Sequence, residues 1–263
     1  MKWYIAVTTA PRKECTLLST LESLEDCGWQ PVVFAEPGST PTDRLTYHNS
    51  ERLGIWRNWV HSIRIALESD ADIIMTVQDD CSFHPESKSY MESIVWPSSD
   101  CGFVSLYTPK HYTFYAPSVL KTLRRKDPDI GTMRPTGINR IYTQSLWGAC
   151  ALAWPRKVLE KVAQHRLMEH WVGATPRSGN PAIYKKRMEN PSIIANSDTA
   201  IGKIMNQMNK SMWFIDPSLV THTARFSSIS HGGNTGRRNA HRIADHSIPL
   251  STQLPVPAER YDI

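Results

Sequence analysis

Short apolar runs alternate with amphipathic segments along the first third of the chain. Residues 3–8, 31–35 and 73–77 are apolar and rich in β-branched side chains, and polar, proline or glycine residues bound each run, as in buried strands. Residues 15–26 and 54–69 repeat apolar side chains at the period of a helix with one buried face. Strands separated by helices predict an α/β fold with a mostly parallel central sheet, whose ligand crevice lies at the carboxyl ends of the strands.

The pattern is less regular in the second half of the chain. It predicts strands at 102–106, 146–154 and 212–215, and a helix that begins at Pro155, where proline is tolerated. A further helix is expected after a cap at Asn196 or Ser197. We therefore expect the alternation of strands and helices to continue, with longer connections between the elements.

The chain beyond the last predicted strand has a different composition. It is rich in Ser, Gly, Asn, Arg and His and shows no apolar period. We expect a single domain over residues 1–231 and a basic, flexible tail over residues 232–263.

Length and charge limit the classes of function. A chain of 263 residues with 40% hydrophobic content can bury the core of one large domain. The net charge of +5 suits an anionic ligand, which could equally be a nucleotide, a phosphosugar or a nucleic acid. Charge alone does not choose among them.

The cysteines and the apolar runs indicate a compartment. The five cysteines are scattered and have no C-x-x-C spacing, so neither a disulfide framework nor a zinc site is indicated. The N-terminal segment lacks the apolar core of a signal peptide, and no run approaches the ~18 apolar residues of a membrane span. These features predict a soluble, cytoplasmic protein without a membrane span.

Two adjacent carboxylates, Asp79 and Asp80, follow the predicted strand 73–77. Like charges side by side repel, so the pair needs either a cation or full solvation. One reading is a site for Mg²⁺ or Mn²⁺ with open positions for phosphate oxygens, and the other is a solvated turn. The location at the carboxyl end of a strand favours the metal site.

The segment Gln78-Asp79-Asp80 resembles the acidic Asp-X-Asp-like motif of nucleotide-sugar-dependent glycosyltransferases of the GT-A fold, which is Rossmann-like. The resemblance implies that Asp80 binds a metal ion that bridges the donor diphosphate, while the first position of the motif touches the ribose. Here that position is Gln78 rather than an acid, and an amide can still hydrogen-bond a hydroxyl.

Other segments resemble the same family in the same order. The resemblance implies donor-binding roles for residues of the first strand and its loop, of the segment ERLGIWRNW and of the segment SLWGACALAW: Thr8, Thr9, Arg12, Arg52, Asn58, Gly148 and Ala149. Four of these residues also have a simpler structural reading. Arg52 and Asn58 could be helix-surface or capping residues, and Gly148 and Ala149 could belong to a crowded core strand.

The last three candidates follow in the second half of the chain. The resemblance implies that Asp198 is the general base of an inverting transfer, that His222 is a second metal ligand and that Arg225 pairs with the diphosphate. The alternatives are a helix-dipole carboxylate for Asp198, an ordinary surface or core histidine for His222 and a solvated basic segment for Arg225.

The sequence therefore predicts a metal-dependent, hexosyltransferase-like glycosyltransferase that moves a sugar from a nucleotide-diphosphate sugar to an acceptor hydroxyl, with inversion. The acceptor is unidentified, because residues 107–143 and 173–192 carry no motif. A glycan and a hydroxylated base in nucleic acid (DNA) are both candidates. The alternative functions are a metal-dependent nucleotidyltransferase and a non-catalytic nucleic-acid-binding protein.

Overall fold

The computed structural model of the chain describes residues 1–94, 96, 99–109, 112, 137–141, 146–173, 181–194, 196–223 and 243–254. No helix within these ranges is both long and apolar enough to cross a membrane. All five cysteines lie in the described ranges and are free thiols.

One large sheet organises the described residues. Its strands, in spatial order, are β3 (Thr46–His48), β2 (Pro31–Ala35), β1 (Trp3–Thr9), β4 (Ile73–Gln78), β8 (Ala151–Pro155), β6 (Cys101–Ser105), β9 (Ser211–Asp216) and β7 (Gly137–Arg140). Strands β1, β2, β3 and β4 are mutually parallel, and β6 is parallel to β9. Strand β8 runs antiparallel to both β4 and β6, and β7 runs antiparallel to β9. The predicted mostly parallel α/β sheet is confirmed, with β7 and β8 as the reversed strands.

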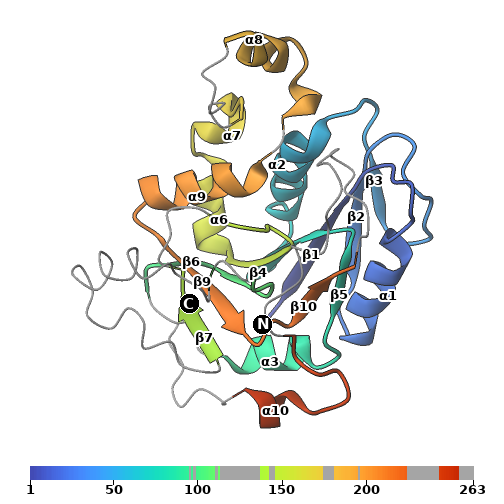
Figure 1. Cartoon of the computed structure of the whole chain (residues 1–263), viewed down its shortest axis with the longest axis vertical. Coiled ribbons are helices and arrows are strands. Elements are labelled where there is room, and N and C mark those ends of the chain that lie inside the picture. Colours follow the sequence, from blue (N-terminus) through green and yellow to red (C-terminus); the bar gives the residue numbers. More distant parts are fainter. Residues whose placement is uncertain are drawn as a thin grey trace.

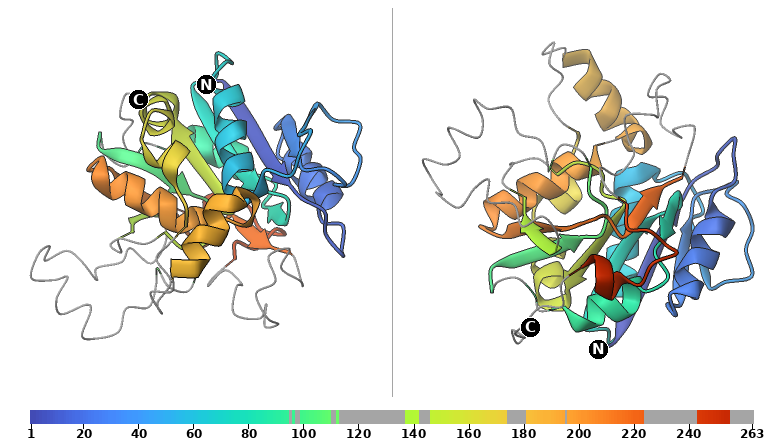
Figure 2. Two further views of the ribbon diagram at one scale, coloured as in Figure 1. Left: turned by 90° about the horizontal axis from the view of Figure 1, so that it is seen from above. Right: turned by 60° about the horizontal axis from the view of Figure 1, so that its bottom comes forward.

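Helices cover both faces of the sheet. Those of the first half are α1 (Leu17–Asp26), α2 (Gly54–Ala66) and α3 (Ser87–Ser93), and those of the second half are α6 (Arg156–Ala163), α7 (Leu167–His170), α8 (Pro181–Glu189), the 3-10 turn η1 (Pro191–Ile193), α9 (Ser197–Gln207) and α10 (Leu250–Gln253). Figure 2 (left) shows β1 between α1 and α2, and Figure 1 shows α8 projecting at the top.

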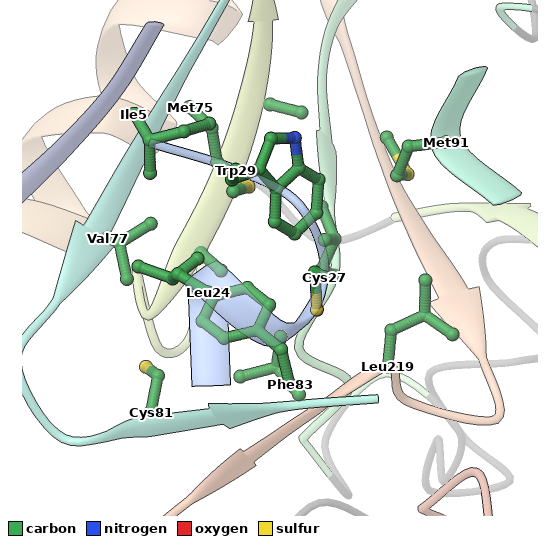
Figure 3. Close-up of a cluster of buried hydrophobic side chains, with 14 of the residues drawn as sticks. Ile5, Leu24, Cys27, Trp29, Met75, Val77, Cys81, Phe83, Met91 and Leu219 are labelled. Carbon is green, nitrogen blue, oxygen red and sulfur yellow. The ribbon is translucent and has the colours of Figure 1, made fainter. Parts of the chain in front are cut away.

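Alternation along the strands divides the core in two. Ile73, Met75 and Val77 of β4 face the cluster beneath α1 and α3, whereas Ile74 faces the cluster beneath α2, α6 and α9. This is the period of two that a strand buried on both faces must show. In the first cluster Leu24 of α1 lies beside Trp29 and Phe83, whose rings meet edge to face with centroids 5.8 Å apart (Figure 3).

A second, two-stranded sheet was not predicted from the sequence. Strand β5 (Cys81–Phe83) leaves the end of β4 and pairs antiparallel with β10 (Val220–His222). The register places His222 opposite Cys81, the residue that follows the acidic pair. Both strands are only three residues long, too short to show a hydrophobic period.

Strand β8 begins later than we predicted. The expected strand at 146–154 starts at Ala151, because the backbone of Gly148 has a positive φ of +75° and does not continue an extended strand. The hydroxyl of Tyr112 accepts from the Trp147 N–H at 2.9 Å and donates to the Trp147 carbonyl at 3.0 Å, which fixes the loop that precedes the strand.

Residues 243–254, part of the expected tail, pack against the domain. Ala244, Leu250 and Leu254 are buried in the first core cluster. The Leu250 N–H donates to the Glu86 carboxylate at 2.8 Å, at the start of α3, and Figure 1 shows α10 beneath α3. The three apolar side chains are too widely spaced among polar residues to reveal a buried face from sequence.

Candidate functional site

The acidic pair lies where the central strands β1 and β4 end. Their parallel register pairs Thr8 with Gln78, so the next residues, Thr9 and Asp79, also meet. The Thr9 hydroxyl donates to Oδ2 of Asp79 at 2.5 Å, and the Thr8 hydroxyl donates to the Val77 carbonyl at 3.3 Å. The expected position of the pair at the carboxyl end of a parallel strand is confirmed.

Both carboxylates are buried, so the solvated-turn reading does not hold. Asp79 is 2% exposed and Asp80 is 4% exposed. The guanidinium of Arg12, from the loop after β1, spans the pair: its Nη2 donates to Oδ1 of Asp79, and its Nη1 lies 2.9 Å from Oδ2 of Asp80. The structure therefore brings Thr9, Arg12, Asp79 and Asp80 into one polar cluster.

The small sheet adds His222 to this cluster. Because β10 pairs with β5 with His222 opposite Cys81, the imidazole Nε2 lies 3.0 Å from Oδ2 of Asp80. The main chain is held as well, since the Thr223 N–H donates to the Asp80 carbonyl at 2.8 Å and the Cys81 N–H donates to the Thr20 hydroxyl at 3.0 Å. The site therefore has a rigid support.

The two carboxyls differ electrostatically. Burial raises the pKa of Asp79, and although Arg12 opposes this, the neighbouring charge of Asp80 adds to it. Burial also acts to raise the pKa of Asp80, but the hydrogen bond from His222 and the charge of Arg12 outweigh burial, so that its pKa lies below the ordinary value. Asp80 is thus the carboxylate that stays ionised most readily.

The chemistry of the cluster fits a divalent cation. Oδ1 of Asp80 is buried and has no hydrogen-bond partner among the described residues. A carboxylate oxygen and an imidazole nitrogen on adjacent side chains are ligands that Mn²⁺ accepts. The described part of the chain contains no group of three or more His, Cys, Asp or Glu side chains that could hold a metal ion. Asp80 and His222 would therefore leave most coordination positions to water and substrate oxygens.

The two residues expected from the ERLGIWRNW segment lie in different surroundings. Asn58 is 2% exposed; its Nδ2 donates to the Phe34 carbonyl of β2 and its Oδ1 accepts from Nδ2 of Asn49, each at 3.0 Å. Arg52 is exposed, and its charge lies near the buried carboxylate of Glu36. Asn58 thus ties the end of β2 to α2, while Arg52 remains at the surface.

Glu36 was not among the candidate residues, yet it connects the end of β2 to the start of α2. It is buried at the end of β2, and its two oxygens accept the N–H groups of Leu53 and Gly54 at 2.9 Å each. These are groups at the start of α2 that have no partner within the helix. From the sequence, Glu36-Pro37-Gly38 indicated only the end of a strand. The signal that could have identified Glu36 is a carboxylate directly after a predicted strand.

Gly148 and Ala149 lie in the loop before β8. A side chain at Gly148 would come within 2.8 Å of the Tyr107 ring, so the glycine permits close packing against Tyr107. Ala149 is buried, and the neighbouring Trp147 is 45% exposed. This loop adjoins the acidic pair, because the Cys150 carbonyl accepts from the Gln78 N–H at 2.9 Å.

Asp198 lies in the first turn of α9 and is half-buried. One of its oxygens accepts from the Thr199 N–H at 2.8 Å. Helix α9 follows η1, and η1 packs on the start of α2: a Cβ built on Gly54 would lie 2.1 Å from the Ser192 carbonyl oxygen. Since Gly54 is itself bound to Glu36 at the end of β2, η1 lies at the edge of the sheet where β2 ends. Arg225 lies outside the described residues.

Comparisons with known proteins establish the fold. No protein-family model and no curated protein matches the chain. Among solved structures, S. aureus TarS in complex with UDP-GlcNAc matches with a TM-score of 0.50 at 10% identity, over 89% of this chain and 62% of that chain. GalNAc-T7 with UDP, GalNAc and Mn²⁺ matches with a TM-score of 0.47 at 11% identity, over 89% and 45% of the two chains. The chain thus spans about half to three-fifths of the length of these proteins.

The likeness to TarS agrees with the mostly parallel α/β sheet of the chain. The chain has the GT-A glycosyltransferase fold, as the motif resemblance predicted. At this level of identity the likeness concerns the fold, and function must be argued from the side chains of the site.

Proposed function

We propose that the chain is a metal-dependent glycosyltransferase that moves a sugar from a nucleotide-diphosphate sugar to an acceptor hydroxyl. The observation that carries the proposal is the cluster at the end of β4, where buried Asp80 has one oxygen beside His222 and the other without a partner among the described residues. Such a carboxylate is costly to bury unless a cation completes it. The GT-A fold of the chain agrees with this use of the site.

Asp80 and His222 would hold the divalent ion, Mn²⁺ or Mg²⁺. When bound, the ion would neutralise negative charge on the leaving diphosphate. The residues around it would act on the rest of the donor: the Gln78 amide can hydrogen-bond a ribose hydroxyl, and Thr8 and Thr9 line the end of β1 next to it. Gly148 and Ala149 leave the backbone of their loop close to the transferred sugar.

Asp198 is proposed as the general base. An inverting transfer needs a carboxylate that takes the proton of the acceptor hydroxyl as its oxygen attacks the anomeric carbon. The support is its place in the first turn of α9, where it is half-buried and accepts a hydrogen bond from the Thr199 N–H. Arg52 and Arg225 are proposed to attract the anionic donor, and Asn58 to position the loop that receives it.

The first experiment measures thermal stability with UDP, GDP, TDP and CMP and their sugar conjugates, each with and without Mn²⁺. Ligand binding to the folded state raises the melting temperature by mass action. We expect one nucleoside diphosphate to give a shift that requires Mn²⁺ and that Asp80→Asn abolishes. If no nucleotide shifts the melting temperature with Mn²⁺ present, the proposal is wrong, and nucleic-acid binding becomes the function to test.

Donor turnover then tests Asp198 and the acceptor. Asp198→Asn should lower the rate of transfer by about 10²-fold or more, while the dissociation constant of the nucleotide stays unchanged. A glycan acceptor and a hydroxylated DNA base can be separated by salt, because retention on duplex DNA falls steeply as salt rises. Equal rates for Asp198→Asn and the wild-type protein would remove Asp198 as the base.

A further inference from the structure

Arg12 lies between Asp79 and Asp80 and contacts both carboxylates. Its side chain is only 12% exposed, and its two terminal nitrogens reach different partners, Asp79 and Asp80. A guanidinium forks between acceptors in a fixed plane and keeps its charge at every accessible pH. Arg12 is therefore a permanent cation inside the site.

The hydrogen bonds of Asp79 are complete, whereas those of Asp80 are not. Oδ2 of Asp79 accepts from Thr9 and Oδ1 accepts from Arg12. Oδ2 of Asp80 is shared by Arg12 and His222, and its Oδ1 has no partner among the described residues. Asp80 therefore has an oxygen open to a cation, whereas each oxygen of Asp79 already has a donor.

The permanent charges of the cluster do not balance. When His222 is neutral, as a metal ligand must be, two buried carboxylates face one guanidinium, which leaves negative charge that a further cation would neutralise. A divalent ion on Asp80 would lie close to the Arg12 guanidinium, and two cations a few ångströms apart in a buried site repel strongly. Metal and Arg12 therefore compete for Asp80.

We propose that Arg12 is an internal cation that occupies Asp80 until a divalent ion replaces it there, and that Asp79 is the positioning residue that retains Arg12. Arg12 stays on Asp79 through Nη2 when Nη1 leaves Asp80. The Thr9 hydroxyl holds Oδ2 of Asp79 and so orients the carboxylate, whose Oδ1 accepts from Arg12.

The released guanidinium then has donors for an anion. Its Nε is buried and has no hydrogen-bond partner within the described ranges, and Nη1 becomes available when it leaves Asp80. Guanidinium groups bind phosphate oxygens in this forked manner. This second step rests on the proposed function: the anion would be the donor diphosphate, and metal binding would strengthen nucleotide binding by freeing Arg12.

The test uses Mn²⁺ alone, without nucleotide, and follows free Mn²⁺ by electron paramagnetic resonance during titration of the full chain. Because Arg12 competes with the metal, Arg12→Ala should bind Mn²⁺ about tenfold more tightly than the wild-type protein, within the usual range of coupling between contacting residues. The matched control is Arg44→Ala, which removes a surface arginine paired with Glu25 and Asp43. Its Mn²⁺ affinity should equal that of the wild-type protein.

Removal of Arg12 leaves two buried carboxylates without the arginine cation that they share, which is destabilising. The melting temperature of Arg12→Ala should therefore fall without metal and recover with Mn²⁺, so the Mn²⁺-induced shift should exceed that of the wild-type protein. Arg12→Lys keeps a cation but cannot donate to both carboxylates through two nitrogens. Its Mn²⁺ affinity should lie between those of the wild-type protein and Arg12→Ala. Unchanged or weaker Mn²⁺ binding in both variants overturns the proposal.

The outcomes separate this inference from the proposed function. If Arg12→Ala binds Mn²⁺ more tightly but no nucleotide binds the wild-type protein, the competition is established and the glycosyltransferase proposal fails. If a nucleoside diphosphate binds with Mn²⁺ but the Arg12 variants bind Mn²⁺ as the wild-type protein does, the function is supported and the inference fails.

Discussion

Nε2 of His222 lies 3.0 Å from Oδ2 of Asp80, although more than half of the chain separates the two residues. The pairing of β5 with β10 brings them together, because β5 continues directly from the acidic turn and β10 ends at His222. Because His222 comes from a separate strand, its imidazole can contact Asp80 without a change in the backbone of β4. This arrangement makes the proposed metal site dependent on a small sheet that lies outside the central one.

The first prediction concerns metal affinity. Asp80→Asn removes the negative charge and His222→Gln removes the imidazole nitrogen, so each should weaken Mn²⁺ binding by at least about tenfold. Isothermal titration with Mn²⁺ measures the change. The matched controls are Asp26→Asn and His170→Gln, at exposed positions on α1 and α7, and they should bind Mn²⁺ as the wild-type protein does. If His222→Gln binds Mn²⁺ normally, His222 orients Asp80 and is not a ligand.

The second prediction concerns Gly54, where the start of α2 meets η1. Gly54 has a φ of +78°, and a Cβ there would lie 2.1 Å from the Ser192 carbonyl oxygen. Gly54→Ala should therefore displace η1 and the start of α9, which carries Asp198, and should lower both the melting temperature and the transfer rate. Differential scanning calorimetry and donor turnover measure the two effects.

The matched control for Gly54 is Gly28→Ala. Gly28 has a nearly identical φ of +82°, but its nearest neighbour would be Cδ of Lys88 at 3.8 Å. The control should cost only the backbone strain, about 1–2 kcal/mol. Equal losses of stability in the two variants would mean that η1 moves away from α2 without cost, and that the start of α9 is not held by this contact.

The sequence was sufficient to predict the central sheet and the place of the acidic pair, because both depend on local patterns. The run 73–77 is buried throughout and apolar except for Thr76, as expected for a strand covered on both faces, and Gln78, Asp79 and Asp80 follow it. Parallel strands separated by helices then determine which edge of the sheet carries the ligand.

Other parts of the site depend on contacts that leave no periodic signal. The ribbon of β5 and β10 is two strands of three residues, and its register follows from long-range pairing alone. Arg12 was expected to face the nucleotide, but its place between Asp79 and Asp80 depends on how the loop after β1 folds back. The roles of Glu36 and Asn58 also arise only when β2 and α2 are packed together.

The third prediction concerns Asn58, whose amide satisfies the buried carbonyl of Phe34. Asn58→Ala should leave that carbonyl without its partner and destabilise the fold by about 1–3 kcal/mol. Urea denaturation measures the loss. Asn206→Ala, at an exposed position of α9, should change stability by about 0.5 kcal/mol or less. A stable Asn58→Ala variant that fails to bind nucleotide would instead assign Asn58 to direct donor contact.

The last prediction concerns Glu36 and pH. Burial raises the pKa of Glu36, and the N–H groups of Leu53 and Gly54 only partly oppose the shift. The folded state therefore holds this proton more tightly than the unfolded chain, so the titration of Glu36 lowers stability as pH rises from the ordinary glutamate value of about 4.3 towards the raised one. Glu36→Gln removes this titration, so the melting temperature of the wild-type protein minus that of the variant should shrink across that pH range and then level off.

Glu22→Gln is the control, at an exposed position of α1. The difference in melting temperature between this variant and the wild-type protein should show no such decline. The opposite slope for Glu36, in which the advantage of the wild-type protein grows with pH, would mean that the positive end of the α2 dipole outweighs burial. In that case the ionised Glu36 would be a stabilising cap, and its pKa in the folded state would lie below the ordinary value.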